Sequence, residues 1–320
     1  MRKITRYLHT TDILLIAFAT LLTFINIVFS SRIAVWKTLI AINCVGTVLI
    51  CLLGYARNRT GGKILGYVHD WYVPPVVFIS FKELYFMIKP IHRGADYDDW
   101  LIAIDRWLFG VNPTEWIMQF ATPWLTELLQ LAYTLFYFLF LMVGYELYRR
   151  QMIVQFRFFM FTCVYGFFLS YIGYFLLPAI GPRFTLHDFS ALDTDLPGIL
   201  LTPYLRWFVN AGEGVPMDLP NALAIAQIQR DVFPSGHTMM TLVLMYFGAI
   251  YRMKVRYFLY GTGALLIIAT VYQRYHYVID LLAGALLAIV CILTSPRVDA
   301  AIRRWCETME SRSEPERDAA

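Results

Sequence analysis

Charged residues are scarce in this sequence, and its few cysteines form no recognisable metal-binding pattern. Only 16% of the 320 residues are charged, whereas 58% are hydrophobic and the mean hydropathy is +0.55. A soluble globular domain has about one quarter charged residues, so this balance favours an integral membrane protein. The five cysteines include no Cys-x-x-Cys pair and no Cys/His spacing typical of zinc. We therefore interpret them as small apolar residues.

Apolar segments that could cross a bilayer recur along the whole sequence. A spanning helix needs roughly 20 mostly apolar residues. The first segment follows Arg2, Lys3 and Arg6, and its length favours a retained helix over a cleaved signal peptide. The third is the weakest, since it contains Lys82 and Glu83. The eight predicted spans are residues 12–30, 34–56, 71–89, 124–148, 155–178, 237–251, 257–273 and 276–295.

The loops between these spans alternate in charge. Basic residues gather on one side, namely Arg57, Arg59, Lys63, Arg149, Arg150, Arg157, Arg252, Lys254, Arg256, Arg297, Arg303 and Arg304. Acidic residues gather on the other, namely Asp96, Asp98, Asp99, Asp105, Asp188, Asp193, Asp195, Glu213 and Asp218. Because cytoplasmic loops are enriched in Lys and Arg, we expect both termini in the cytoplasm. The sequence thus predicts an all-α, polytopic membrane helix bundle.

Two loops on the outer side are long. Apolar residues of the first, residues 89–123, recur at helical spacing, which predicts a helix lying in the outer interface. They are Trp100, Leu101, Ile104, Trp107 and Leu108, with the nearby acids off this face. The second, residues 181–233, is too long to be an idle linker. We expect three regions: N-terminal membrane helices (1–60), a catalytic helix bundle (61–296) and a charged cytoplasmic tail (297–320).

Three short polar stretches lie at the ends of spans on the predicted outer side. Residues 180–183 end the fifth span, residues 233–237 open the sixth and residues 275–280 open the eighth. Polar residues at these positions in so apolar a chain indicate function. Each stretch alone has an ordinary structural explanation, but three that meet at one face predict an active site.

The third stretch contains a His–Asp pair. His276 and Asp280 are four residues apart, so they share a face on a helix. A carboxylate bonded to one imidazole nitrogen fixes the tautomer and leaves the other nitrogen free to attack. Ser235 and His237 make a poor serine-hydrolase pair, because residues two apart do not face each other.

The other two stretches predict an anion site. Pro234, Ser235 and Gly236 form a turn that presents backbone N–H groups at the start of a helix. Arg183 offers a planar guanidinium that suits two phosphate oxygens. His237 begins the same helix and is placed to give a proton to a leaving oxygen. Together these residues predict chemistry on a phosphate ester.

These stretches resemble the motifs of the type 2 phosphatidic acid phosphatase superfamily, a group of membrane phosphatases and phosphotransferases. Its Pro-Ser-Gly-His motif matches residues 234–237, and the His-x3-Asp of its third motif matches His276 and Asp280. The resemblance covers roughly residues 95–290 and implies a six-helix catalytic core, here preceded by two further helices. It also implies that His276 is the nucleophile, which forms a phosphohistidine, and that His237 is the proton donor.

The sequence departs from this family in its cationic residues. Leu176 stands where the first motif, Lys-x6-Arg-Pro, has its lysine, and Pro182 precedes Arg183 instead of following it. Thr270 stands where the third motif has an arginine. Arg274, and after it Arg230, are the candidates for the missing phosphate contacts.

One branch of the superfamily resembles the sequence more closely. Residues 105–110, 181–183 and 274–284 are similar to the branch that contains fungal inositol phosphorylceramide synthase. Members of that branch move a phospho-alcohol headgroup between lipids. The resemblance therefore implies headgroup transfer in sphingolipid or phospholipid metabolism.

Several functions remain open at this point. A lipid phosphotransferase and a lipid phosphate phosphatase differ in whether a lipid alcohol or water resolves the intermediate. A transporter is compatible with eight spans, but the matching Gly/Pro-broken spans of many transporters are absent from the sequence. A metal-dependent transferase would use Asp96, Asp98 and Asp99, since close acids bind Mg²⁺, although such acids are more often a solvated rim.

The favoured interpretation defines the expected partners. They are a lipid phosphate ester, a lipid alcohol acceptor such as diacylglycerol or ceramide, and the bilayer itself. No cofactor, metal or nucleic acid is expected. The loop charges predict an active site on the extracytoplasmic face, periplasmic or lumenal.

Overall fold

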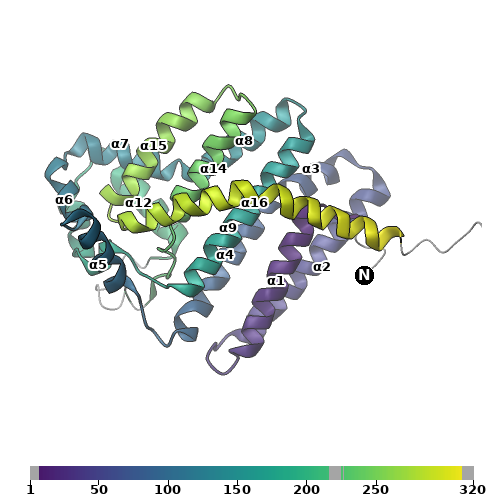
Figure 1. The fold of residues 1–320 in the computed structure, drawn as a ribbon, viewed down its shortest axis with the longest axis horizontal. Coiled ribbons are helices and arrows are strands. Elements are labelled where there is room, and N and C mark those ends of the chain that lie inside the picture. The colour runs from purple at the N-terminus through teal and green to yellow at the C-terminus, as the bar shows by residue number, and fades with distance from the viewer. Residues whose placement is uncertain (1–6, 216–224, 226, 312–320) are drawn as a thin grey trace, which may run out of the picture. The chain divides into compact units, whose positions relative to one another are not determined.

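The computed structural model describes residues 7–215, 225 and 227–311 (Figure 1). This part of the chain is helical and contains no β-strand, so the all-α prediction is confirmed. Several residues on which the sequence-based predictions rest lie outside the described residues, namely Arg2, Lys3, Arg6, Asp218 and residues 312–320 of the tail.

The chain divides into two compact units. The first takes in the described residues of 1–91, 153–168 and 291–320, and the second those of 92–152 and 169–290. Two long helices, α9 (Ile153–Leu176) and α16 (Val278–Ser311), contribute residues to both units. All predicted site residues belong to the second unit. The sequence-based boundaries at residues 60 and 296 stay a prediction.

The first unit begins with four helices. They are α1 (Thr10–Val28), α2 (Trp36–Thr60), α3 (Lys63–Trp71) and α4 (Val73–Ile91). A buried carboxylate joins three of them, since Glu83 of α4 accepts hydrogen bonds from the side chains of Asn26 in α1 (3.0 Å) and Asn43 in α2 (2.8 Å). Hydrogen bonds of this kind stabilise helix contacts in an apolar surrounding, which explains an acid within the weakest predicted span.

A His/Asp cluster fixes the start of α1. Asp12 accepts hydrogen bonds from His69 Nε2 (2.9 Å) and the Tyr72 hydroxyl (2.6 Å), and the Arg57 guanidinium contacts ring nitrogens of His9 and His69. The centroids of the two imidazole rings lie 4.4 Å apart in a stacked arrangement, and one nitrogen of each ring faces the same guanidinium nitrogen of Arg57. Burial lowers the pKa of His9 to about 4 and leaves it neutral, able to accept from Arg57. The cluster is a hydrogen-bonded network that joins α1, α2 and α3.

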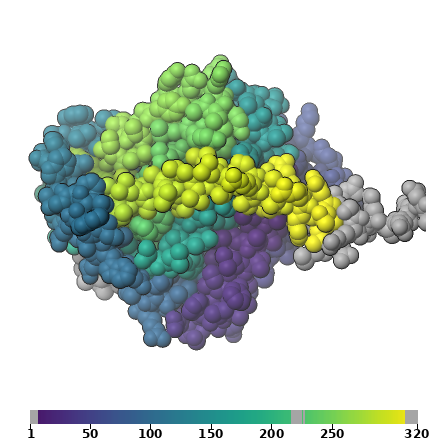
Figure 2. Space-filling model, viewed as in Figure 1, coloured from purple at the N-terminus to yellow at the C-terminus, as the bar shows by residue number. Residues whose placement is uncertain are grey.

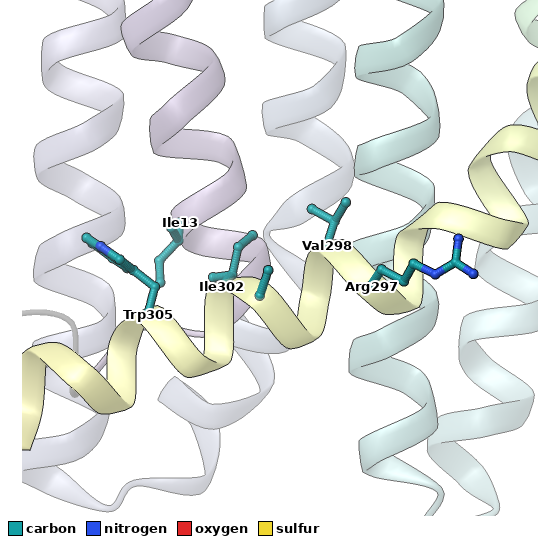
Figure 3. Close-up of a pocket in the computed structure, with 6 residues that line it drawn as sticks. Ile13, Arg297, Val298, Ile302 and Trp305 are labelled. Atoms are coloured by element: carbon teal, nitrogen blue, oxygen red, sulfur yellow. The ribbon is translucent and has the colours of Figure 1, made fainter.

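The last turns of α16 cross the start of α1 (Figure 2). The helix continues through Pro296, and Asp299 accepts a hydrogen bond from Thr10 (2.6 Å). Figure 3 shows the open apolar groove between the two helices, with Trp305 and Arg297 at its ends. Its floor consists of Ile13, Val298, Ala301 and Ile302.

The prediction of eight spans is not confirmed. In the described part of the chain, four helices are long and apolar enough to cross a membrane, namely α1, α2, α9 and α16. Helices α7 (Pro123–Thr134) and α8 (Phe136–Arg149) qualify together, as one span bent by 49°. The predicted sixth and seventh spans, α14 (Gly236–Ile250) and α15 (Arg256–Tyr272), are apolar but shorter. At 1.5 Å per residue they fall short of the roughly 30 Å hydrocarbon core.

The second unit is built around α14 and α15. Helix α14 packs against α15 and α8, and α15 packs against α7, which in turn packs against α12. Helix α12 spans Thr202–Glu213. The unit also contains α5 (Asp98–Phe109), α6 (Pro113–Trp116), α10 (Pro182–Thr185) and α11 (Leu192–Asp195), with 3₁₀ turns η2 (Ile117–Phe120) and η3 (Phe189–Ala191). The site lies where α14 and α16 begin.

Candidate active site

The two predicted catalytic histidines lie against each other. His276 Nε2 is 3.5 Å from His237 Nδ1, and His276 Nδ1 is 3.4 Å from an oxygen of Asp280. These contacts are long for hydrogen bonds, as is common in catalytic sites without substrate. The arrangement aims one nitrogen of His276 at a carboxylate and the other at a second imidazole.

The start of α16 positions the His–Asp pair. Asp280 is the third residue of the helix, and its carboxylate accepts the backbone N–H of Tyr277 (2.8 Å). This contact resembles one half of a capping box, which holds a helix start rigidly. The turn before it is also fixed, because the backbone N–H groups of Tyr275 (2.9 Å) and His276 (3.0 Å) both donate to the carbonyl of Thr270.

The start of α14 is tied to the same place. The Ser235 side chain accepts the backbone N–H of Thr238 (3.2 Å), so Ser235 is the N-cap. Its own backbone N–H donates to the carbonyl of Asp280 (3.0 Å). Gly236 is needed for close packing, because a Cβ there would lie 2.6 Å from the Tyr174 hydroxyl. The second and third stretches therefore meet through their backbones.

Two aromatic rings that the sequence analysis missed hold His237. Tyr133 and Phe136 lie on either side of Leu135, where α7 gives way to α8, and their ring centroids lie 4.7 and 4.4 Å from that of His237. His237 Nε2 is buried and has no hydrogen-bond partner within the described chain. A buried polar atom of this kind in an otherwise packed site indicates a functional role.

Arg183 lies beside the histidines and is only 8% exposed. Its guanidinium pairs with Glu213 (2.6 Å) and lies 4.8 Å from the ring centroid of Tyr275, next to His276. Its backbone N–H donates to the carbonyl of Arg274 (3.0 Å). The first stretch is thus joined to the third, and all three predicted stretches converge.

The two alternative arginines are occupied elsewhere. Arg274 pairs with Asp195 (2.8 Å), and Arg230 pairs with both carboxylate oxygens of Asp96 (3.0 and 3.2 Å). Their assignment as phosphate-binding residues stays a prediction. Of the three acids proposed for a metal, Asp96 binds Arg230 and Asp98 accepts hydrogen bonds from two backbone N–H groups and a tyrosine, while Asp99 is exposed.

The protonation state of His276 suits a nucleophile. Burial lowers the pKa of this imidazole to about 3. The ring is therefore neutral at neutral pH, which is the form that has a lone pair to attack phosphorus. Burial also raises the pKa of Tyr275 to about 12, so the ring beside Arg183 stays uncharged.

A neutral imidazole beside a carboxylate, a second imidazole against it and a buried arginine come together where α14 and α16 begin. The chain belongs to the PAP2 superfamily, whose family model matches residues 99–294 and so takes in every predicted site residue. This superfamily consists of phosphatases and phosphotransferases, and the chain is an enzyme of that class. No curated protein and no solved structure matches it.

Substitution of Arg183 by lysine tests its role. Arg183→Lys keeps the charge but loses the fork that binds two phosphate oxygens. A hydrogen bond to a charged group contributes about 1.5–3 kcal/mol, so we expect kcat/KM to fall roughly 10- to 100-fold with unchanged folding. Arg256→Lys, on α15, is the control. Full activity in both Arg183→Lys and Arg183→Ala would remove Arg183 from the chemistry and leave the Gly-Pro-Arg stretch as the start of α10.

Proposed function

We propose that this protein is a lipid phosphotransferase that moves a phospho-alcohol headgroup from one lipid to another through a phosphohistidine at His276. The contact between His276 Nε2 and His237 Nδ1, with Asp280 on the opposite nitrogen of His276, carries the proposal. It supplies a nucleophile, its orienting carboxylate and a proton carrier in one buried place.

The first half-reaction forms the covalent intermediate. His276 Nε2 attacks phosphorus, and a P–N bond forms as the P–O bond to the leaving lipid alcohol breaks. His237, as an imidazolium, gives its extra proton to the departing oxygen and becomes neutral, a transfer that contributes roughly 10²–10⁴-fold in such reactions. Asp280 stabilises the positive charge that develops on the His276 ring.

The second half-reaction reverses these roles. The hydroxyl of an acceptor lipid attacks phosphorus, and its proton passes to His237. The new P–O bond forms as the P–N bond breaks, which restores neutral His276. Water in place of the acceptor would give hydrolysis, so transfer needs an acceptor that reaches phosphorus before water does.

The charges of the site support a phosphodiester over a phosphomonoester donor. Leu176 and Thr270 stand in place of two family cations, and the guanidinium of Arg183 is already paired with Glu213. A phosphomonoester brings close to two negative charges near neutral pH, whereas a phosphodiester brings one. Arg183 is one cation in a site that also contains the carboxylates of Glu213 and Asp280. It therefore suits the single negative charge of a phosphodiester better than the two charges of a phosphomonoester. The loop charges support a site on the extracytoplasmic side of the membrane.

Product analysis tests this proposal. Purified protein would be given a phosphodiester lipid with labelled headgroup phosphate, with and without diacylglycerol or ceramide. We expect label in a new lipid that depends on the acceptor, and slower turnover of a matched phosphomonoester lipid. Release of free headgroup phosphate at the same rate with or without acceptor would identify a hydrolase. Faster turnover of the monoester would contradict the charge argument.

A further inference from the structure

Helix α5 has an unusual distribution of side chains. Trp100, Ile104 and Trp107 are exposed, Trp107 at 82%, while Asp98 and Asp105 are buried, Asp105 at 1%. In water an amphipathic helix buries its apolar face and exposes its charges. The reversed arrangement fits a helix whose outer face meets lipid. The inward carboxylates then need partners, because a buried unpaired charge is costly.

Asp98 holds the first stretch of the site. Its carboxylate accepts the backbone N–H groups of Ile180 (3.0 Å) and Gly181 (2.8 Å), three and two residues before Arg183. Gly181 has a φ of +92°, and a Cβ there would lie 2.9 Å from the carbonyl of Tyr275. The backbone at Gly181 is therefore confined by two neighbours, the carbonyl of Tyr275 and the carboxylate of Asp98.

The same carboxylate reaches the third stretch. Asp98 also accepts the hydroxyl of Tyr277 (2.8 Å), the residue between His276 and the start of α16. That hydroxyl is also 2.6 Å from Thr185 of α10. One side chain thus links the backbone that carries Arg183 to the residue that follows His276.

Asp105 holds the start of α16. Its two oxygens accept the backbone N–H groups of Val278 and Ile279, each at 2.8 Å. These amides are among the first of the helix, which have no partner within it. A carboxylate at a helix N-terminus is also favoured by the helix dipole. Asp105 is therefore a cap supplied by another element, directly before Asp280.

Leu101 completes the buried face of α5. It lies three residues after Asp98 and four before Asp105, so all three share one face. Leu101 packs in one apolar cluster with Ala179, Val232 and Tyr277. These residues adjoin or belong to the three catalytic stretches, so the buried face of α5 contacts all of them.

We propose that Asp98 and Asp105 are positioning residues, through which α5 holds the nucleophile, its carboxylate and the phosphate-binding arginine in register. Neither acid contacts His276 or His237 among the described hydrogen bonds, so each acts through backbone that it fixes. The kinetic test of this positioning role rests on the proposed function. The hydrogen bonds of Asp98 and Asp105 to backbone N–H groups do not depend on that function. A displacement of roughly 1 Å in a catalytic group costs about 10²-fold, which sets the scale of the expected effect.

Asp105→Asn is the principal test. Asparagine keeps one oxygen but turns an N–H₂ group toward a backbone N–H, so one of the two caps is lost. We expect kcat to fall roughly 10²-fold with KM little changed and the melting temperature near that of the parent. Asp98→Asn should behave alike. Asp105→Glu keeps both oxygens and should recover part of kcat. Asp99→Asn, on the exposed side of α5, is the matched control.

Hydrogen exchange supplies a test that needs no activity. In Asp105→Asn, the backbone amides of Val278 and Ile279 should exchange faster than in the parent, and they should not in Asp99→Asn. Faster exchange together with unchanged kcat would overturn the positioning role. Unchanged exchange would overturn the cap itself. If the parent protein transfers no phosphate group, the proposed function fails, while the exchange experiment still tests whether α5 holds these amides.

Discussion

His276→Ala is expected to abolish turnover on every substrate and with every acceptor. Both half-reactions pass through a bond to His276 Nε2, so no alternative route through the site remains. Loss of the nucleophile in an enzyme with a covalent intermediate costs about 10⁶-fold, which here means activity at background. The assay is transfer of labelled headgroup phosphate between lipids by the purified variant. The backbone N–H of His276 donates to the carbonyl of Thr270 on α15, a bond that alanine keeps, so we expect the variant to fold.

A second histidine variant controls for folding and handling. His187, in the same unit, contacts Thr114 (3.2 Å) and neither catalytic histidine. His187→Ala should keep activity within a few-fold of the parent. Turnover by His276→Ala well above background, under conditions in which His187→Ala behaves normally, would remove His276 from the chemistry.

Asp280→Asn is expected to have the second largest effect. The amide has nearly the shape of the carboxylate but no charge to stabilise the imidazolium, and its N–H₂ can hold the wrong tautomer of His276. The equivalent change in a serine-protease triad costs about 10⁴-fold. Because His276 Nδ1 lies 3.4 Å from Asp280, a longer contact than in a tight triad, we expect roughly 10²–10⁴-fold in kcat.

Two measurements separate catalysis from folding in this variant. Asp280 also accepts the backbone N–H of Tyr277, so the melting temperature must be compared with that of the parent. Asp299→Asn is the matched control, since Asp299 is a buried, hydrogen-bonded acid further along α16. Equal activity in Asp280→Asn and the parent would show that this acid only caps the helix.

The site was predictable where short-range spacing determines it. A Ser N-cap places His237 one residue into α14, and an acid at the third position of α16 faces a histidine just before the helix. Both relations follow from helix geometry, and the structure brings all three stretches together. The partners that complete the site are distant in sequence: the rings of Tyr133 and Phe136 and the carboxylate of Glu213. No local pattern indicates them.

The fold was predictable in class but not in detail. Composition alone indicated an apolar helical chain, and the structure is all-helical. The count of eight spans is not confirmed, because windows of apolar residues do not show that α14 and α15 are short, or that α7 and α8 meet at a bend. Helix α5 was placed correctly in sequence, but Leu101 faces inward with Asp98 and Asp105. Asp98, interpreted from sequence as part of a solvated rim, is buried and holds the backbone of the site, whereas Asp99 is exposed.

Trapping of the phosphoenzyme tests the central claim most directly. The parent protein would react briefly with a donor labelled in its phosphate and then be quenched and separated from lipid. We predict label on the protein that is lost in acid and stable in alkali, maps to His276 and is absent from His276→Ala. In His237→Ala it should still form from an activated donor whose leaving group needs little protonation. Label that persists in His276→Ala, or that maps to Ser235, would contradict a phosphohistidine at His276.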